Sequence, residues 1–354
     1  MARTLSFLAL ILLWFGLEGS ARAQFSTSQQ SDRIDVMRDG KLVTSYLFRS
    51  GTKPVLWPIN GPDGRKMTRS YPMDDTVPNE AHDHPHHRGL WMTFGEVDQK
   101  DWWAEGKDKG IVEHQRVVSC DSQGARVSWV AEHVWKKTGD DAQNGSVAVL
   151  KETARYTVGG NDDETIIDCE YIWRAADPSA KIHFGDTKEG MFAIRVPETM
   201  RGDKPGGELL NSVGDKQGDA WGKSAKWVDY SGPVPNGGDK LYGIAILVHP
   251  KSFHADGLWH ARTYGLFAHN AFGIKDFMGN RTKTKSAELP SPYPAGGYEL
   301  APGESLHFMY RVVFHRNRWD IKTGDSYWND FSQLPTIESS KTSPGASRSG
   351  GTIA

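Results

Sequence analysis

Apolar and polar residues alternate with a period of two over long stretches of this chain. In residues 166–173, every second side chain is apolar or aromatic, and Asp168 and Glu170 occupy positions between them. Residues 306–314 repeat the pattern. Because successive side chains of a strand point to opposite faces, this pattern predicts strands with one buried and one polar face. Further strands are predicted at 34–37, 41–47, 111–120, 126–135, 147–158, 191–196 and 241–248.

Turn-forming residues separate these predicted strands. Glycine, asparagine and aspartate gather at 39–40, 123–124, 159–162 and 236–238, which is typical of hairpins and loops. No convincing helical periodicity of ten or more residues is found. Sheets with one apolar face bury it against another sheet. The sequence therefore predicts an all-β fold, a large antiparallel β-sandwich.

The two ends of the chain differ from its middle. Arg3, an apolar run at 5–17 and the small residues Ala21 and Ala23 predict a cleavable signal peptide over 1–23, with cleavage near Ala23. The run is too short to span a bilayer, and none like it follows, so we expect a periplasmic or secreted protein with no membrane span. Residues 339–354 are rich in serine, threonine and glycine and are expected to be a disordered tail. Residues 24–338 are expected to form a single domain.

Charge and motifs narrow the classes of function. The net charge is −2 with no basic stripe, which disfavours nucleic acid as a partner. No nucleophile elbow and no nucleotide-binding glycine motif is present in a suitable context. Cys120 and Cys169 both lie in predicted strands, where a disulfide and two buried thiols are equally compatible with the pattern.

The most unusual segment holds four of the 13 histidines within six residues, at His82, His84, His86 and His87. In an extended segment His82, His84 and His86 would share one side, but Pro85 indicates an edge or a loop. Neutral imidazole is the commonest metal ligand and also titrates nearest to neutral pH. The three histidines on one side are therefore candidate ligands for zinc or copper, and His86 and His87 are candidate catalytic acids or bases. A plain polar surface loop is the alternative.

Charged and aromatic residues follow the histidines closely. Arg88 could clamp a polar or anionic group, and tryptophan rings could stack on the apolar faces of a sugar. Trp91 is expected to pack inward. Trp102 and Trp103 are adjacent, so in an extended segment they cannot both point inward, and both are candidate substrate-binding residues. His269 and Asn270, near the end of a later strand, are further candidates for substrate binding.

A second polar segment spans residues 181–190, between two predicted strands. Asp186 or Glu189 could serve as a base there, and His183 or Lys188 as an acid. Loops between strands commonly display catalytic groups. A charged hairpin turn is the alternative for this segment.

Four segments together, "HDHPHHRGLW", "GDTKEGMFAIRVP", "YGIAILVHP" and "LAPGESLHFMYRVVFH", resemble an exported bacterial family labelled methane oxygenase PmoA. The resemblance covers most of the chain after residue 23. It does not extend to the membrane-embedded methane monooxygenase subunit, because no spanning apolar stretch follows the signal. Members of the family are similar to galactose-mutarotase-type supersandwiches. The resemblance implies a sugar-related ligand, with His86 or His87 as acid and Glu189 as base.

Two functions remain open from the sequence. One is a carbohydrate-active enzyme that transfers protons on a sugar, of the epimerase, lyase or glycoside-cleaving type. Its catalytic set would be His86, His87, Arg88, Asp186, Lys188 and Glu189. The other is a non-catalytic protein that binds a sugar or a metal. Both require that the segments at 82–88 and 186–189 converge over one aromatic surface.

Overall fold

Alternating burial runs along β8 (Val127–Lys137) and β10 (Glu164–Ala175), as the period of two predicts. The buried face of β10 carries Cys169, Tyr171 and Trp173, each 2 % exposed or less. In the computed structural model, which describes residues 24–139, 145–281 and 296–334, these strands belong to an antiparallel sheet. The alternation therefore marks the face that this sheet turns toward the interior.

Two large antiparallel sheets are built from the described residues. The eight-stranded sheet has the order β13 (Glu208–Asn211), β14 (Trp227–Pro233), β15 (Leu241–Val248), β19 (Ser305–Arg316), β10, β9 (Val147–Gly160), β8, β6 (Ile111–Cys120). The nine-stranded sheet has the order β16 (Leu258–Trp259), β17 (Leu266–Asn270), β12 (Gly190–Arg195), β5 (Leu90–Phe94), β4 (Lys53–Ile59), β3 (Lys41–Ser50), β2 (Arg33–Arg38), β1 (Phe25–Gln29), β7 (Gln123–Gly124). A separate pair joins β11 (Ile182–Phe184) to β18 (Tyr298–Leu300).

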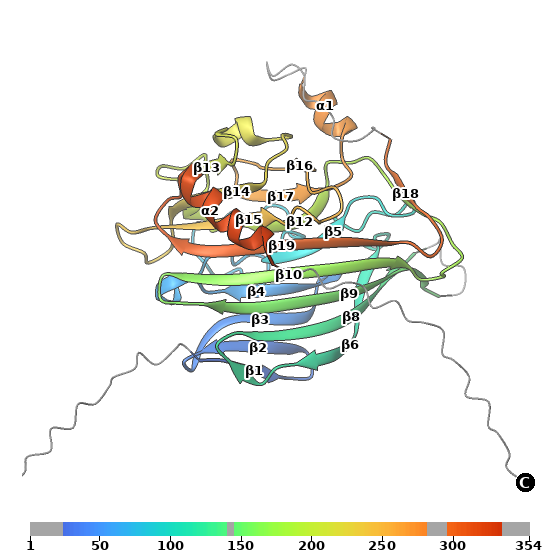
Figure 1. Ribbon diagram of the computed structural model, residues 1–354, viewed down its shortest axis with the longest axis horizontal. Helices are drawn as coiled ribbons and strands as arrows, with labels where there is room; N and C mark the ends of the chain where they lie inside the picture. The colour runs from blue at the N-terminus through green and yellow to red at the C-terminus, as the bar shows by residue number, and fades with distance from the viewer. Residues whose placement is uncertain (1–23, 140–144, 282–295, 335–354) are drawn as a thin grey trace, which may run out of the picture.

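The two sheets lie one over the other, with β10, β9, β8 and β6 in front of β4 to β1 in Figure 1. Helix α2 (Ile321–Ser332) lies on the outside of the eight-stranded sheet, over β14 and β15. Helix α1 (Lys275–Arg281) follows β17. Three short 3-10 turns complete the described elements, η1 (Pro62–Gly64), η2 (Glu198–Met200) and η3 (Gln217–Ala220).

The core between the sheets is aromatic and contains one buried polar network. The Glu152 carboxylate accepts hydrogen bonds from the indole N–H groups of Trp135 and Trp173, at 3.1 and 2.6 Å. Its other oxygen lies 2.7 Å from Nδ1 of His133, whose Nε2 lies 2.5 Å from the Tyr46 hydroxyl. Each polar atom of this network thus has a partner, which buried polar groups require.

Three strands of the nine-stranded sheet are buried on both faces. Every residue of β5, β12 and β17 is buried. Their inward side chains, such as Phe192 and Ile194, join the core between the sheets. Their outward side chains join a second apolar cluster, the outer-face cluster, which comprises Val55, Trp91, Trp103, Ala193, Leu266 and Ala268, with Leu47, Trp57 and Tyr264 packed against it. Loops therefore cover the outer face of this sheet.

The predicted fold class is confirmed, because antiparallel sheets packed face to face dominate the described residues. Helix α2 contradicts the expectation that no helix of ten or more residues is present. Asp320 caps this helix by accepting the N–H of Thr323, at 2.7 Å. Cys120 and Cys169 are both free, so the disulfide alternative is wrong. None of the helices within the described ranges has the length and apolar character that a bilayer crossing needs. The predicted signal peptide and tail lie outside the described residues.

Candidate functional site

The histidine-rich segment forms a tight turn between β4 and β5. The N–H of His87 donates to the carbonyl oxygen of His84, at 3.0 Å, with Pro85 and His86 at the centre of the turn. His84 has a φ of +44°, which a side chain other than glycine rarely adopts. Such backbone strain is concentrated at functional sites. The segment is not extended, so the shared side expected for His82, His84 and His86 is wrong.

The turn stacks aromatic rings in a continuous series on the outer face of the nine-stranded sheet. The ring of His84 lies parallel to those of Tyr264 and His87, with centroids 5.3 and 4.7 Å apart. His87 in turn stacks on Trp91, at 5.5 Å. His86 meets His87 edge-on, at 4.5 Å and 80°. We define the histidine site as the stacked residues His84, His86, His87, Trp91 and Tyr264 together with two neighbouring charged groups. These groups are the pair Asp83 and Arg195, and the cluster of Lys53, Arg88 and Glu105.

A buried arginine holds the turn in place. The side chain of Arg69 is 1 % exposed. Its guanidinium donates to the main-chain oxygens of Ala81, Asp83, His84 and His87. Because Arg69 satisfies several carbonyl groups of one loop at once, it fixes the backbone that presents the histidines.

Asp83 and Arg195 connect the turn to strand β12. The Asp83 carboxylate accepts hydrogen bonds from Arg69 at 2.5 Å and from Arg195 at 2.9 Å, and Nδ1 of His84 lies 2.9 Å from it. Burial acts to raise the pKa of Asp83, but Arg195, His84 and Arg69 outweigh it and hold the pKa at about 2. Asp83 is therefore an ionised anchor at neutral pH.

A second carboxylate lies beside the turn. The Glu105 carboxylate accepts hydrogen bonds from Nε and Nη2 of Arg88, at 2.8 and 2.9 Å, and from Nζ of Lys53, at 2.9 Å. The Lys53 side chain is fully buried, and burial lowers its pKa to about 8 despite the attraction of Glu105. Arg88 is thus bound within the protein and is not an open clamp for a ligand.

The two central histidines are uncharged at neutral pH. Burial, followed by the charges of Lys53 and His84, lowers the pKa of His86 to about 4. Burial, followed by the charges of His86 and Arg195, lowers the pKa of His87 well below its usual value. Nη1 of Arg195 lies 3.3 Å from Nδ1 of His87. Because arginine only donates, Nδ1 of His87 accepts and its proton must be on Nε2.

The neighbouring tryptophans separate to the two faces of the sheet. Trp102 packs on Trp135 in the core between the sheets, at 5.1 Å, and is 1 % exposed, so it does not face a ligand. Trp103 lies in the outer-face cluster, in contact with the rings of His86 and His87. Trp91 also lies there and not in the sandwich core, contrary to expectation. Trp91 and Trp103 are 1 and 2 % exposed, so they support the histidines from below.

The segment at 186–189 reaches the same sheet at its other end. Strands β5 and β12 pair with Leu90 opposite Ile194 and Phe94 opposite Gly190. At about 3.3 Å per residue, the backbone of Glu189 lies roughly 15–20 Å along the pair from the turn. The main-chain N–H of Gly95 donates to the carbonyl oxygen of Glu189, at 2.6 Å, so Glu189 lies beside the end of β5. The charge of Glu189 acts on His86, raising its pKa against burial.

The roles of the other residues in this segment differ from expectation. Asp186 accepts the main-chain N–H groups of Ile274, Lys275 and Gly296, at 2.6 to 2.8 Å, so it anchors loops and is not placed as a catalytic group. Nζ of Lys188 lies 2.6 Å from Glu189.

The two residues predicted on β17 are buried structural groups. His269 is 0 % exposed, points to the core and lies 3.1 Å from the Tyr310 hydroxyl. Asn270, also 0 % exposed, accepts the N–H groups of Phe272 and Gly273 and donates to the carbonyl of Thr187. Neither is placed to contact a substrate on the outer face.

The predicted metal ligands do not gather around one point. His82 stacks on Tyr71 at 4.5 Å, whereas His84 and His86 belong to the ring stack. Within the described ranges, no three His, Cys, Asp or Glu side chains are grouped as a metal ion requires. The zinc or copper site stays a prediction from sequence.

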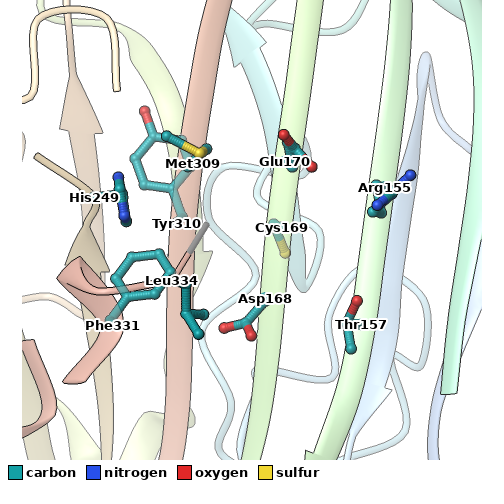
Figure 2. A pocket seen from close by; sticks show the side chains of 10 residues that line it. All are labelled: Arg155, Thr157, Asp168, Cys169, Glu170, His249, Met309, Tyr310, Phe331 and Leu334. Atoms are coloured by element: carbon teal, nitrogen blue, oxygen red, sulfur yellow. The ribbon is translucent and has the colours of Figure 1, made fainter. Parts of the chain in front are cut away.

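A separate pocket lies on the eight-stranded sheet (Figure 2). It has a volume of about 170 Å³, and its lining includes Asp168, Glu170, His249 and Phe331. None of the predicted site residues lines it. The chemistry expected from the sequence therefore belongs to the other sheet.

Several residues of the histidine site are absent from the sequence-based set, namely Lys53, Arg69, Asp83, Glu105, Arg195 and Tyr264. One signal was available for Arg195, which is the charged residue that ends the apolar run of β12. A charge in a strand that is buried on both faces needs partners. The partners of Arg195 are Asp83 and His87 of the histidine turn.

Comparisons with solved structures give distant likenesses. A β-arabinopyranosidase is 10 % identical, with a TM-score of 0.32, over 84 % of this chain, which spans only 38 % of that protein. A candidate aldose 1-epimerase from Escherichia coli K12 is 10 % identical, with a TM-score of 0.29, over 83 % of this chain and 99 % of its own. At such scores neither likeness carries an argument about this chain. No curated protein matches the sequence.

The comparison with family models gives a match over most of the chain. The label methane oxygenase PmoA is not confirmed by it, because the matching model is described only as a family of unknown function. The match runs from residue 33 to residue 329 and so includes both sheets and the histidine turn. This chain belongs to the family of unknown function DUF6807.

Proposed function

We propose that the histidine site is the catalytic centre of a carbohydrate-active enzyme that transfers protons on a sugar. The observation that supports it is the pairing of two uncharged histidines in one turn, one with its proton fixed by Arg195. An exported enzyme of the epimerase, lyase or glycoside-cleaving type fits this chemistry.

His86 is the proton acceptor in this proposal. It is half-buried and, with a pKa of about 4, carries a free nitrogen lone pair at neutral pH. A group that is already deprotonated can take a proton from a substrate held within hydrogen-bond distance. The low pKa makes it unsuited to begin the reaction as an acid.

His87 is a neutral hydrogen-bond donor. Arg195 occupies Nδ1, so His87 has its proton on Nε2. Its ring is 1 % exposed, so in this proposal His87 holds the edge-on ring of His86 in place and does not itself contact the sugar. Its stacking between His84 and Trp91 holds the ring in one orientation.

Glu189 supplies a second site for a proton at the far end of the β5 and β12 pair. Its charge acts on both His86 and Tyr264, so it borders the same region. Lys188 contacts its carboxylate at 2.6 Å. A substrate lying along the strands between His86 and Glu189 would meet one group at each end.

A sugar suits the groups that remain accessible. His84 is 42 % exposed at its side chain, and Tyr264 is half-buried beside it, so their stacked rings form an aromatic edge. Aromatic surfaces next to charged groups bind the apolar faces and the hydroxyls of sugars. The buried tryptophans below add rigidity to this edge.

Proton transfer is tested by following exchange between sugars and deuterated water with NMR, using a panel of neutral, oxidised and uronic sugars. We expect the unaltered protein to promote exchange, and His86→Gln to slow it by about 10²-fold or more. His87→Gln should act similarly. His307→Gln, on β19 of the other sheet, where the imidazole lies 2.7 Å from Glu170, is the matched control and should keep full activity. Equal rates in His86→Gln and the unaltered protein would contradict the proposal, and binding without exchange would make the protein a binding protein only.

A further inference from the structure

An arginine without a counter-ion lies at the edge of the histidine site. Arg262 belongs to the tight turn between β16 and β17, in which its N–H donates to Leu266 and its carbonyl accepts from Gly265, at 2.7 and 3.0 Å. Its guanidinium lies against the rings of Tyr264 and Trp221, at 5.4 and 6.0 Å from their centroids. Within the described part of the chain, no carboxylate pairs with it and its side chain makes no hydrogen bond.

The turn that carries Arg262 is held rigidly. The hydroxyl of Tyr230 donates to the carbonyl oxygen of Thr263, at 2.7 Å, and accepts the N–H of Gly202, at 2.7 Å. The guanidinium lies near two rings, those of Trp221 and Tyr264. A half-buried charge that is held in place yet left unpaired lacks the compensation that buried charges usually have.

Arg262 and the histidine site share one neighbour. Tyr264, whose ring contacts Arg262, stacks directly on His84, the outermost histidine of the series. Arg262, Lys188 and His84 all act on the buried His260, after burial itself, and lower its pKa to about 3. Arg262 and His84 are thus joined through the ring of Tyr264, and both lie near His260.

Cations outnumber carboxylates in the two ion-pair clusters of the histidine site. Asp83 is shared by Arg69 and Arg195, and Glu105 is shared by Lys53 and Arg88. Each carboxylate therefore neutralises only one of the two cations that it contacts. The whole chain has a net charge of −2, so this concentration of cations is local. A local positive field of this kind attracts anionic ligands.

We propose that the substrate is an acidic sugar whose oxyanion group, a carboxylate or a sulfate ester, binds to Arg262. This inference rests on the proposed function and adds the substrate class to it. The planar guanidinium offers paired donors that match an oxyanion. The sugar ring would then lie on the edge formed by Tyr264 and His84, with its reacting atoms toward His86.

Binding is measured by calorimetry at low salt with three probes, D-glucuronate, D-glucose 6-sulfate and D-glucose. We expect at least one acidic sugar to bind the full chain more tightly than D-glucose. Arg262→Gln should raise the Kd of that acidic sugar by about tenfold or more and leave the Kd of D-glucose unchanged. Arg262→Lys should retain part of the affinity. The preferred probe distinguishes a carboxylate from a sulfate ester.

Arg155→Gln, an exposed arginine on β9 in the other sheet, is the matched control and should change none of the three affinities. Circular dichroism and thermal unfolding confirm that each variant is folded. Equal binding of all three probes, or an equal loss for all three in Arg262→Gln, would overturn the inference. Proton exchange on neutral sugars that is independent of Arg262 would overturn it and leave the proposed function standing. Arg262-dependent binding of acidic sugars without proton exchange would contradict the proposed function and leave the binding of an oxyanion by Arg262 standing.

Discussion

Nη1 of Arg195 donates a hydrogen bond to Nδ1 of His87 across 3.3 Å, while Nη2 of the same guanidinium contacts Asp83 at 2.9 Å. Arg195 thus joins the end of strand β12 to the histidine turn and decides which nitrogen of His87 carries the proton. An ionised carboxylate and a neutral imidazole share one guanidinium, whose rigid fork directs one nitrogen to each of them.

Replacing Arg195 with lysine keeps the charge but removes the fork. An ammonium group cannot reach Asp83 and His87 in the same planar arrangement, so we expect kcat to fall by about 10–10² -fold with a smaller change in KM. Nitrogen NMR of the imidazole should show His87 as a mixture of tautomers. Arg201→Lys, at an arginine paired with Glu198 outside this turn, is the control and should leave both readouts unchanged. A single His87 tautomer in Arg195→Lys would contradict the assignment.

Replacing Arg69 with methionine should loosen the turn itself. The change leaves the loop carbonyls that Arg69 now satisfies without their donor, and we expect unfolding to require about 3–5 kcal/mol less free energy. Hydrogen exchange should become faster in residues 81–87 before it does in the sheets. Arg201→Met removes an arginine that is 16 % exposed and pairs with Glu198 and Asp203 at the surface, and should cost less. Unchanged exchange at 81–87 would show that Arg69 does not hold the turn.

Trp102 and Trp103 are adjacent in sequence but should respond oppositely to substitution by phenylalanine. Trp102→Phe loses the hydrogen bond from its indole to Val97, at 3.0 Å, and packing in the core, so stability should fall by about 1–3 kcal/mol with little change in kcat/KM. Trp103 contacts both His86 and His87, and its indole N–H has no partner among the described residues. Trp103→Phe should therefore lower kcat/KM more than it lowers stability. Steady-state kinetics and urea unfolding of both variants test this, and a reversed order would contradict it.

Substitutions of Asp186 and Glu189 should have different effects, because Asp186 anchors loops and Glu189 is a proposed catalytic group. Asp186→Asn turns one acceptor oxygen into a donor facing a main-chain N–H, and we expect a loss of stability of about 1–3 kcal/mol with a nearly normal kcat. Glu189→Gln preserves shape and should lower kcat with little loss of stability. Thermal unfolding and kinetics distinguish the two. A large kcat effect from Asp186→Asn in a fully stable protein would restore Asp186 as a catalytic residue.

Acid should destabilise the protein through its buried histidines. Burial lowers the pKa of His114 to about 4, as it does for His86. An unfolded histidine titrates near 6.5, so between about pH 6.5 and 4 the unfolded state binds more protons. The free energy of unfolding is therefore fully retained above pH 6.5 and falls as the pH drops through this window.

His114→Phe tests this pH dependence. The ring of His114 stacks on Phe48 at 4.1 Å, and phenylalanine can keep that stack while removing one titrating group. We expect the fall in stability with acid to become shallower, by up to about 1.4 kcal/mol per pH unit. Urea unfolding at four pH values between 7.5 and 4.5 measures it. Identical slopes for both proteins would rule out His114 as a contributor.

The sequence predicted the long alternating strands, such as β8 and β10, and also β12 and β15, which are buried on both faces. Strands β6 and β15 have the predicted bounds, and β8 and β10 differ by a few residues at their ends. Strands β5 and β17 were missed, and their burial on both faces removes the alternation. Helix α2 was missed because its apolar face is narrow, with Phe331 and Gly324 as its buried residues.

The candidate site was predictable only in part, because several of its residues come from separate elements of the chain. The histidine cluster is visible in the sequence because its residues are neighbours along the chain. Lys53, Arg195 and Tyr264 come from three separate elements, and only the order of strands in the nine-stranded sheet brings them to the turn. His269 and Asn270 were predicted to bind substrate, but a histidine near a strand end gives no indication of which face it occupies, and both side chains are buried.

The Glu152 network in the core has a consequence for strand alignment. Glu152 on β9 takes its partners from β8 and β10, the strands on either side of it. If β9 slid by one residue, this carboxylate would turn toward solvent and leave two indoles and an imidazole without an acceptor in a dry interior. Apolar side chains alone would tolerate several alignments of three such long strands, whereas one acid with three partners favours a single one.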